Sequence, residues 1–184
     1  MTSEACPPDL LNGLLEALDE DDQRGLERLD ALLLDYGADA RLHFLRGSIL
    51  AGLKRYEAAI AAIGKAVELD PDFAAARFQL GFLHYTSGDP QTAEQVWRPL
   101  AGLPETAPPR LFAQGLVQLA RDEIEAGIAT LEQGMALNHE NPPMNGDMRL
   151  LINTIRQQLA NAQDEPLSST QLLLQRFDGA GVKH

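Results

Sequence analysis

The spacing of apolar residues along the chain predicts a pair of amphipathic helices. Apolar side chains recur every three to four positions through residues 40–53 and again through residues 56–69, which is the period of one face of an α-helix. The basic pair at 54–55 lies between the two runs and marks a turn. Asp70 ends the second run, because the residue before Pro71 avoids helical backbone angles. The pattern therefore predicts a helical hairpin.

The same pattern recurs at an interval of 34 residues. Five columns of residues keep their class through three copies when the chain is shifted against itself by this interval. A single hairpin cannot bury its own apolar face, so the copies are expected to stack into a solenoid. The matching columns are Gly47, Gly81 and Gly115; Phe44, Phe78 and Phe112; Ala59, Ala93 and Gly127; Ile63, Trp97 and Leu131; and Leu69, Leu103 and Leu137.

Proline interrupts the pattern in the second copy. Pro99 falls inside the second helix of this copy, where proline loses a backbone hydrogen bond and costs about 3 kcal/mol unless the helix ends there. We therefore expect a kink or an early stop near residues 97–98. A loop through Pro104, Pro108 and Pro109 is expected to follow.

Further helices are predicted on both sides of the three copies. In the acidic segment before them, Gly25 and Leu29 keep the register of the repeat and indicate a degenerate hairpin. After them, apolar residues share one face from Asn145 to about Ala160, as in a helix that caps the last hairpin. The predicted organisation is a hairpin at 1–39, repeats at 40–73, 74–107 and 108–141, a capping helix at 142–161, and a linker, short helix and flexible tail at 162–184.

The distribution of charge restricts the class of partner. The formal net charge is -12, and residues 1–39 alone hold eleven acids and two bases, a net of -9. Nucleic acids and anionic membrane surfaces bind clustered Lys and Arg, so neither is an expected partner. The first residues lack the basic and apolar segments of a signal peptide, and no apolar run is long enough to span a membrane. A cytoplasmic protein is therefore expected.

The reactive side chains form no catalytic or metal-binding pattern. The sequence has no glycine-rich phosphate loop with a lysine and no paired-histidine zinc motif. His84 is expected to be a packed core residue inside a hairpin and not a metal ligand. The acidic run at 19–22 lacks the glycine and glutamate of a calcium loop and is expected to be a solvated turn. Cys6 is expected in a frayed segment. We predict a non-enzymatic protein without cofactor or metal.

The first copy resembles a known structural family. The segment LRGSILAGLKRYEAAIAAIGKAVELDP is similar to the tetratricopeptide repeat, a 34-residue helix–turn–helix unit. Gly47, Ala59, Ala66 and Pro71 stand where that family has Gly, Ala, Ala and Pro. The resemblance implies an all-α, right-handed α-solenoid of three to four hairpins with a C-terminal capping helix.

The later copies resemble the same family less closely. The segment LGFLHYTSGDPQTAEQVW is similar through Gly81, Ala93 and Trp97. The third copy has glycines at 127 and 134, where the family usually has alanine. Together the three copies extend the resemblance over residues 40–141.

The resemblance also implies a binding surface, because the first helix of each hairpin lines the concave side of such solenoids. We expect an apolar groove there that holds an apolar peptide or helix of a partner protein, with Phe78 as its central anchor. Whether residues 168–177 fill this groove, which protein binds and what the oligomeric state is remain open. The predicted groove residues are Arg41, Phe44, Ser48, Phe78, Phe82, Tyr85, Phe112, Leu116 and Leu119.

The leading functional hypothesis is a protein-interaction adaptor or scaffold. A first alternative is a chaperone for a secreted protein. Three repeats, an acidic N-terminal helical region and a C-terminal helix are similar in arrangement to the translocator chaperones of type III secretion. A second alternative is a non-catalytic subunit of an enzyme complex.

Overall fold

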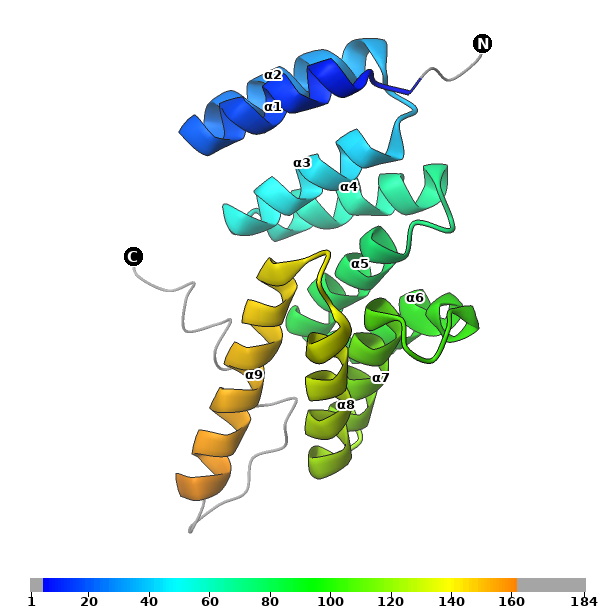
Figure 1. Ribbon diagram of the computed structural model, residues 1–184, viewed down its shortest axis with the longest axis vertical. Helices are drawn as coiled ribbons and strands as arrows, with labels where there is room; N and C mark the ends of the chain where they lie inside the picture. Colours follow the sequence, from blue (N-terminus) through cyan, green and yellow to red (C-terminus); the bar gives the residue numbers. More distant parts are fainter. Residues whose placement is uncertain (1–4, 162–184) are drawn as a thin grey trace. The chain divides into compact units, whose positions relative to one another are not determined.

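The computed structural model describes residues 5–161, and in that part of the chain every regular element is a helix (Figure 1). The predicted all-α fold of tandem hairpins is therefore confirmed. The chain divides into two compact units inside α5, between Leu80 and Gly81. The predictions for residues 162–184 lie outside the described residues. The elements are α1 (Pro8–Glu20), α2 (Asp22–Asp35), α3 (Ala40–Gly52), α4 (Tyr56–Leu69), α5 (Ala74–Thr86), α6 (Pro90–Trp97), the 3-10 helix η1 (Arg98–Gly102), α7 (Pro108–Ala120), α8 (Ile124–Leu137) and α9 (Pro142–Asn161).

α1 and α2 pack against each other as a helical hairpin ahead of the three repeats (Figure 1). A single residue, Asp21, separates them. Its carboxylate accepts hydrogen bonds from the backbone N–H groups of Gln23 at 2.7 Å and Arg24 at 3.0 Å. These bonds satisfy donors that a helix start leaves without partners. Asp21 therefore caps α2. The buried core of this region consists of Cys6, Leu14, Leu29 and Leu42.

Cys6 is buried, so the prediction of a frayed segment is wrong at this residue. Its backbone N–H donates to Asp39 Oδ2 at 2.8 Å, and its carbonyl accepts from Arg41 Nη2 at 3.0 Å. Burial raises the pKa of the Asp39 carboxyl, but hydrogen bonds from Arg41 and from the Cys6 amide outweigh it and leave this pKa below its ordinary value. The segment before α1 is thus fastened to the start of α3.

The α3–α4 hairpin follows the predicted pattern. α3 begins after Asp39, whose side chain accepts from the Arg41 backbone N–H at 3.0 Å. The predicted turn contains Lys54 with a φ of 60°, a left-handed conformation that is uncommon for residues other than glycine. Gly47 packs against the Ile63 side chain, and a Cβ at Gly47 would lie 3.1 Å from the Ala59 carbonyl oxygen. Only glycine lets the two helices approach so closely.

The second unit begins within α5. The turn between α5 and α6 forms where the sequence predicts it. The Asp89 side chain accepts from the Thr92 backbone N–H at 3.0 Å and caps α6. α6 ends at Trp97, and Pro99 lies in the 3-10 helix that follows. The predicted early stop is therefore confirmed. The predicted loop is shorter than expected, because Pro108 begins α7, where a missing N–H costs nothing.

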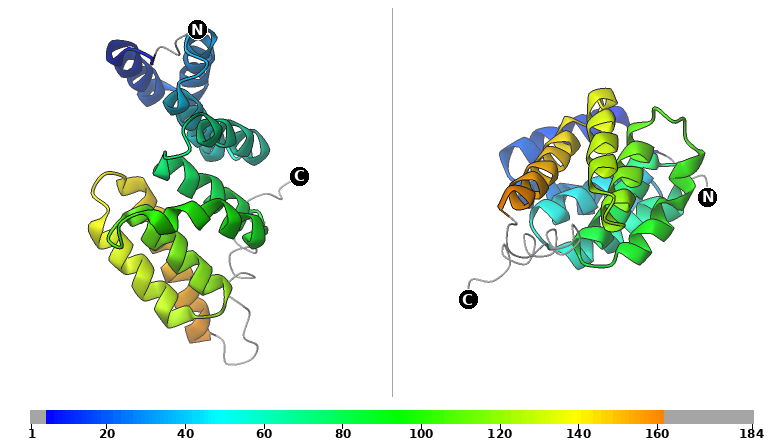
Figure 2. Two further views of the ribbon diagram at one scale, coloured as in Figure 1. Left: turned by 90° about the vertical axis from the view of Figure 1, so that its right-hand side faces the viewer. Right: turned by 90° about the horizontal axis from the view of Figure 1, so that it is seen from below.

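α7 and α8 form the hairpin of the third repeat, named the third hairpin from here on. The two helices run antiparallel and side by side (Figure 2). Their interface is built on glycines. A Cβ at Gly115 would lie 2.7 Å from Leu131 Cγ, and one at Gly127 would lie 2.7 Å from Leu119 Cγ. Each glycine therefore accepts a large side chain from the opposite helix.

α9 follows the third hairpin and packs along α8 (Figure 2). It begins at Pro142, three residues before the predicted start at Asn145, because proline suits the first turn of a helix. The nearly buried Asn138 fixes the connection, since its Nδ2 donates to Asn141 O at 2.7 Å and to Asn145 Oδ1 at 2.8 Å. The buried face of α9 consists of Met144, Met148, Leu151, Ile152 and Ile155.

Candidate protein-interaction surfaces

Most of the predicted groove residues are core residues. Five of the nine side chains are exposed by 2% or less, so the expectation that they line an open face is wrong. Arg41 is exposed, and Phe44, Ser48 and Phe82 are half-buried. The five buried residues are Phe78, Tyr85, Phe112, Leu116 and Leu119.

In the hairpin of α7 and α8, the glycines of α8 explain why the predicted groove residues of α7 are buried. A Cβ at Gly134 would lie 2.7 Å from Phe112 Cε1, so the phenylalanine ring occupies the space that an alanine methyl would take. Leu119 packs in the same way onto Gly127. In the hairpin before it, the Tyr85 ring lies 5.9 Å from the Trp97 ring. These side chains of the first helices therefore face the second helix of their own hairpin.

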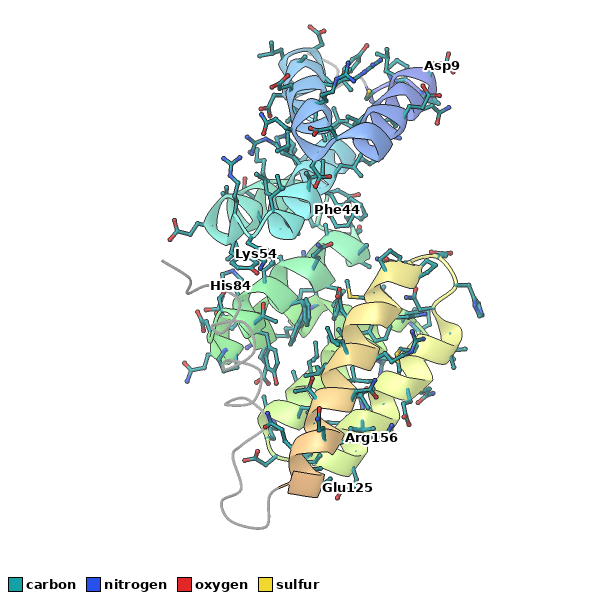
Figure 3. The ribbon with its side chains drawn as sticks, turned by 90° about the vertical axis from the view of Figure 1, so that its left-hand side faces the viewer. Asp9, Phe44, Lys54, His84, Glu125 and Arg156 are labelled. Carbon is teal, nitrogen blue, oxygen red and sulfur yellow. The ribbon has the colours of Figure 1, made fainter. Side chains whose placement is uncertain are left out.

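Three of the predicted groove residues lie on α3, in the first unit, and are exposed or half-buried. Arg41, Phe44 and Ser48 are spaced so that they share one face of this helix. The half-buried Phe44 lies against Phe73, with ring centroids 5.0 Å apart and ring planes at 56°. The Ser48 hydroxyl donates to the Phe44 carbonyl at 3.0 Å and lies 3.4 Å from Gln79 Oε1. Figure 3 labels Phe44 on this helix.

This α3 face combines an aromatic pair with polar groups of both signs. The guanidinium of Arg41 is about half exposed while it pairs with Asp39 at 2.6 Å. The amide of Gln79 is half-buried next to Ser48. An aromatic surface rimmed by a fixed cation and an amide can hold an apolar side chain and hydrogen-bond the backbone that carries it.

The second unit contains a separate hollow that the sequence analysis did not anticipate. It has a volume of about 310 Å³ and lies between α6, η1 and α7. Trp97, Leu100 and Ala113 line it, and Arg98 and Arg110 add cationic groups. A second hollow of about 170 Å³ shares Trp97 with it. The early stop at Pro99 was the signal that could have indicated it, because a helix that ends early leaves part of the next helix uncovered.

The described residues contain no candidate metal cluster. Between residues 5 and 161, no group of three or more His, Cys, Asp and Glu side chains could hold a metal ion. His84, expected to pack inside a hairpin, is half-buried in the last turn of α5. Of the helices in this part of the chain, none has the length and apolar character needed to cross a membrane.

Comparisons with known proteins agree with the repeat architecture. A family model described as TPR repeat matches residues 47–88, which span the end of α3, all of α4 and all of α5. No curated protein matches the chain. The crystal structure of MamA is similar with a TM-score of 0.57 and 16% sequence identity, covering 73% of this chain and 79% of that chain.

Two further MamA structures are similar over more of the chain. A structure described as MamA 41-end, from Desulfovibrio magneticus RS-1, gives a TM-score of 0.58 with 18% identity and covers 85% of this chain and 96% of that one. The ArsTM double mutant of MamA RS-1 gives 0.58 with 16% identity and covers 93% of each chain. At this identity the likeness concerns the fold alone.

The fold and the repeat pattern define a protein built of tandem helical hairpins. Residues 47–88 match the family model of the tetratricopeptide repeat, the family that the sequence resembles. Repeats of this family are protein-interaction units and generally non-enzymatic. The match to this family model supports a protein-interaction role, and the similar solved structures support the fold alone.

Proposed function

We propose that this chain is a cytoplasmic, non-enzymatic scaffold that holds an apolar segment of a partner protein on the α3 face. The observation that carries the proposal is the half-buried pair of Phe44, on α3, and Phe73, just before α5, with polar groups around it. Aromatic side chains that are partly exposed and rimmed by polar groups dominate many protein interfaces.

The surroundings of Phe44 suggest how a partner segment would bind. An apolar side chain of the partner would cover the Phe44 and Phe73 rings and remove their exposed area from water, which stabilises the complex. The Gln79 amide can pair with a backbone group of the bound segment. Arg41 is held in place by Asp39 and Cys6, so its ordering costs little on binding.

Selection from a displayed peptide library against the full chain tests this proposal. We expect enriched peptides to share one or two aromatic or aliphatic positions. Phe44→Ala should weaken the binding of a selected peptide at least tenfold, because truncating a central aromatic anchor typically costs about 2 kcal/mol. Leu53→Ala is the matched control, since Leu53 is an exposed apolar residue just beyond the end of α3.

Two results would contradict the proposal. In one, the library yields no apolar consensus at all. In the other, Phe44→Ala binds the selected peptides as tightly as the wild-type chain while circular dichroism shows both to be folded.

A further inference from the structure

The hollow between α6, η1 and α7 has an apolar floor. Trp97, Leu100 and Ala113 form this floor and are themselves almost fully buried. The volume of about 310 Å³ lies at the lower end of the range for pockets that hold small ligands, roughly 300–1,000 Å³. An aliphatic side chain is smaller than this and fits without rearrangement of the helices.

The rim of the hollow carries a cation that is available for a partner. Glu94, which also lines the hollow, pairs with Arg121 at 2.7 Å, and Arg110 donates to the Leu103 carbonyl at 2.6 Å. Arg98 is exposed, and its guanidinium makes no ion pair or hydrogen bond within residues 5–161. The matching ligand therefore has an apolar side chain with a carboxylate beside it.

The same chain presents this combination on α2. Leu34 is 87% exposed, far more than any other large apolar side chain in the described part of the chain. Asp35 follows it directly and is exposed without an ion pair among residues 5–161. One helical turn earlier lies Asp30, which pairs with Arg46 at 2.7 Å. A lone exposed leucine at the end of an acidic helix is complementary to an apolar hollow with a cationic rim.

We propose that the chain associates with itself head to tail, with Leu34 of one copy seated in the α6–η1–α7 hollow of a second copy and Asp35 beside Arg98. The two surfaces differ and lie on different elements of the same chain. A contact of this kind is heterologous, because it joins two different surfaces. In a dimer one copy therefore keeps its Leu34 unused and the other keeps its hollow unused, and the assembly can extend from either. This self-association uses neither Phe44 nor Phe73 and is therefore independent of the partner surface on α3.

Charge favours this contact over a contact between two like surfaces. Residues 1–39 carry a net charge of -9, so two α2 surfaces repel each other. The hollow of the second copy instead offers Arg98 to Asp35. Exposed ion pairs contribute little on their own, so burial of Leu34 supplies most of the affinity and the charges supply orientation.

Sedimentation velocity of the full chain over a range of concentrations tests the proposal. The wild-type chain should form species larger than a monomer as concentration rises. Leu34→Ser should weaken association at least tenfold because the apolar burial is lost, and Arg98→Glu should do so because the charge reversal sets a carboxylate against Asp35. Far-UV circular dichroism and Tm should confirm that both variants are folded. Leu150→Ser is the matched control, because Leu150 is also an exposed leucine, on α9, and its replacement should leave association unchanged.

A mixture of the two variants gives the decisive result. The Leu34→Ser chain keeps an intact hollow, and the Arg98→Glu chain keeps Leu34 and Asp35 intact. Together they should form a 1:1 dimer that does not grow further, although each alone remains monomeric. The proposal is overturned if the wild-type chain is monomeric at every concentration, if Leu34→Ser associates like the wild type, or if the mixture contains only monomers.

Discussion

The α3–α4 and α7–α8 hairpins occupy equivalent positions of the repeat but present their first helices differently. Both have a glycine on the first helix that faces a branched side chain on the second, Gly47 with Ile63 and Gly115 with Leu131. Phe44 of α3 is nevertheless half-buried, whereas the equivalent Phe112 of α7 is 2% exposed. The repeat register is the same, so the difference arises from the residues around it.

The sizes of the residues on the second helix account for this difference. Phe112 packs on Gly134, whereas the position equivalent to Gly134 in α4 is Ala66, which is fully buried. The extra methyl group leaves less room for a phenylalanine, and Phe44 instead lies against Phe73. In these two hairpins the larger residue on the second helix thus accompanies the more exposed phenylalanine on the first.

The largest expected effect is a difference in the free energy of unfolding between the Phe112→Ala and Phe44→Ala variants. Phe112→Ala should lower the free energy of unfolding by about 3–5 kcal/mol, because it leaves a cavity beside Gly134. Phe44→Ala should cost about 1–2 kcal/mol, because only part of its ring is buried. Urea denaturation followed by circular dichroism measures both. Equal losses would remove the proposed difference between the hairpins.

Overpacking should destabilise both hairpins to a similar degree. Ala59→Leu places a larger side chain at a fully buried position between α3 and α4, and Gly115→Ala places a Cβ 2.7 Å from Leu131 Cγ. Each should cost about 1–3 kcal/mol. Thermal unfolding is the measurement. An unchanged Tm for either variant would show that the helix register in that hairpin is wrong.

The start of α3 depends on a buried carboxylate, whereas α7 begins with Pro108 and has no side-chain cap. Asp39→Ala should cost about 1–3 kcal/mol, because the Cys6 amide and Arg41 lose their partner. The pKa of Asp39 is lowered in the folded state, so its contribution is present above an unfolded pKa of about 3.9 and is lost as pH falls below that value. The wild-type chain and Asp39→Ala should therefore converge in stability in acid.

The smallest expected effect has the opposite sign. A Cβ at Gly64 would meet no atom within 4 Å, so Gly64→Ala adds helix propensity to α4 without a clash. The free energy of unfolding should rise by about 0.5–1 kcal/mol. Its contrast with Gly115→Ala sharpens the comparison, because one glycine is needed for close packing and the other is not. A loss of stability in the Gly64 variant would contradict this distinction.

Local chemistry explains the parts of the fold that the sequence predicted well. The turns before Tyr56 and Pro90 and the early stop before Pro99 each depend on a few neighbouring residues, and all three are confirmed. Cys6 was misplaced because its partner, Asp39, lies 33 residues away. A hydrogen bond over that separation leaves no periodic signal in the sequence.

The predicted groove was wrong at five positions because repeat register alone does not fix which side of a helix faces its partner. The glycines at 127 and 134 were visible in the sequence as departures from alanine. Their consequence appears only when the volumes of facing residues are compared, with Leu119 and Phe112 filling the space that the missing methyl groups leave. The hollow at α6 was missed although Pro99 was identified, since its floor combines residues from three elements.

Hydroxyl-radical footprinting of the full chain tests the central claim most directly, because oxidation rates follow the solvent exposure of individual side chains. Mass spectrometry of the oxidised protein reports Phe44 and Phe112 in the same sample, without any mutation. The structure predicts that Phe44 is oxidised several times faster than Phe112, and that both react at similar rates once the chain is unfolded. Equal rates in the folded protein, or faster oxidation of Phe112, would contradict a binding face on α3 and a closed core in the third hairpin.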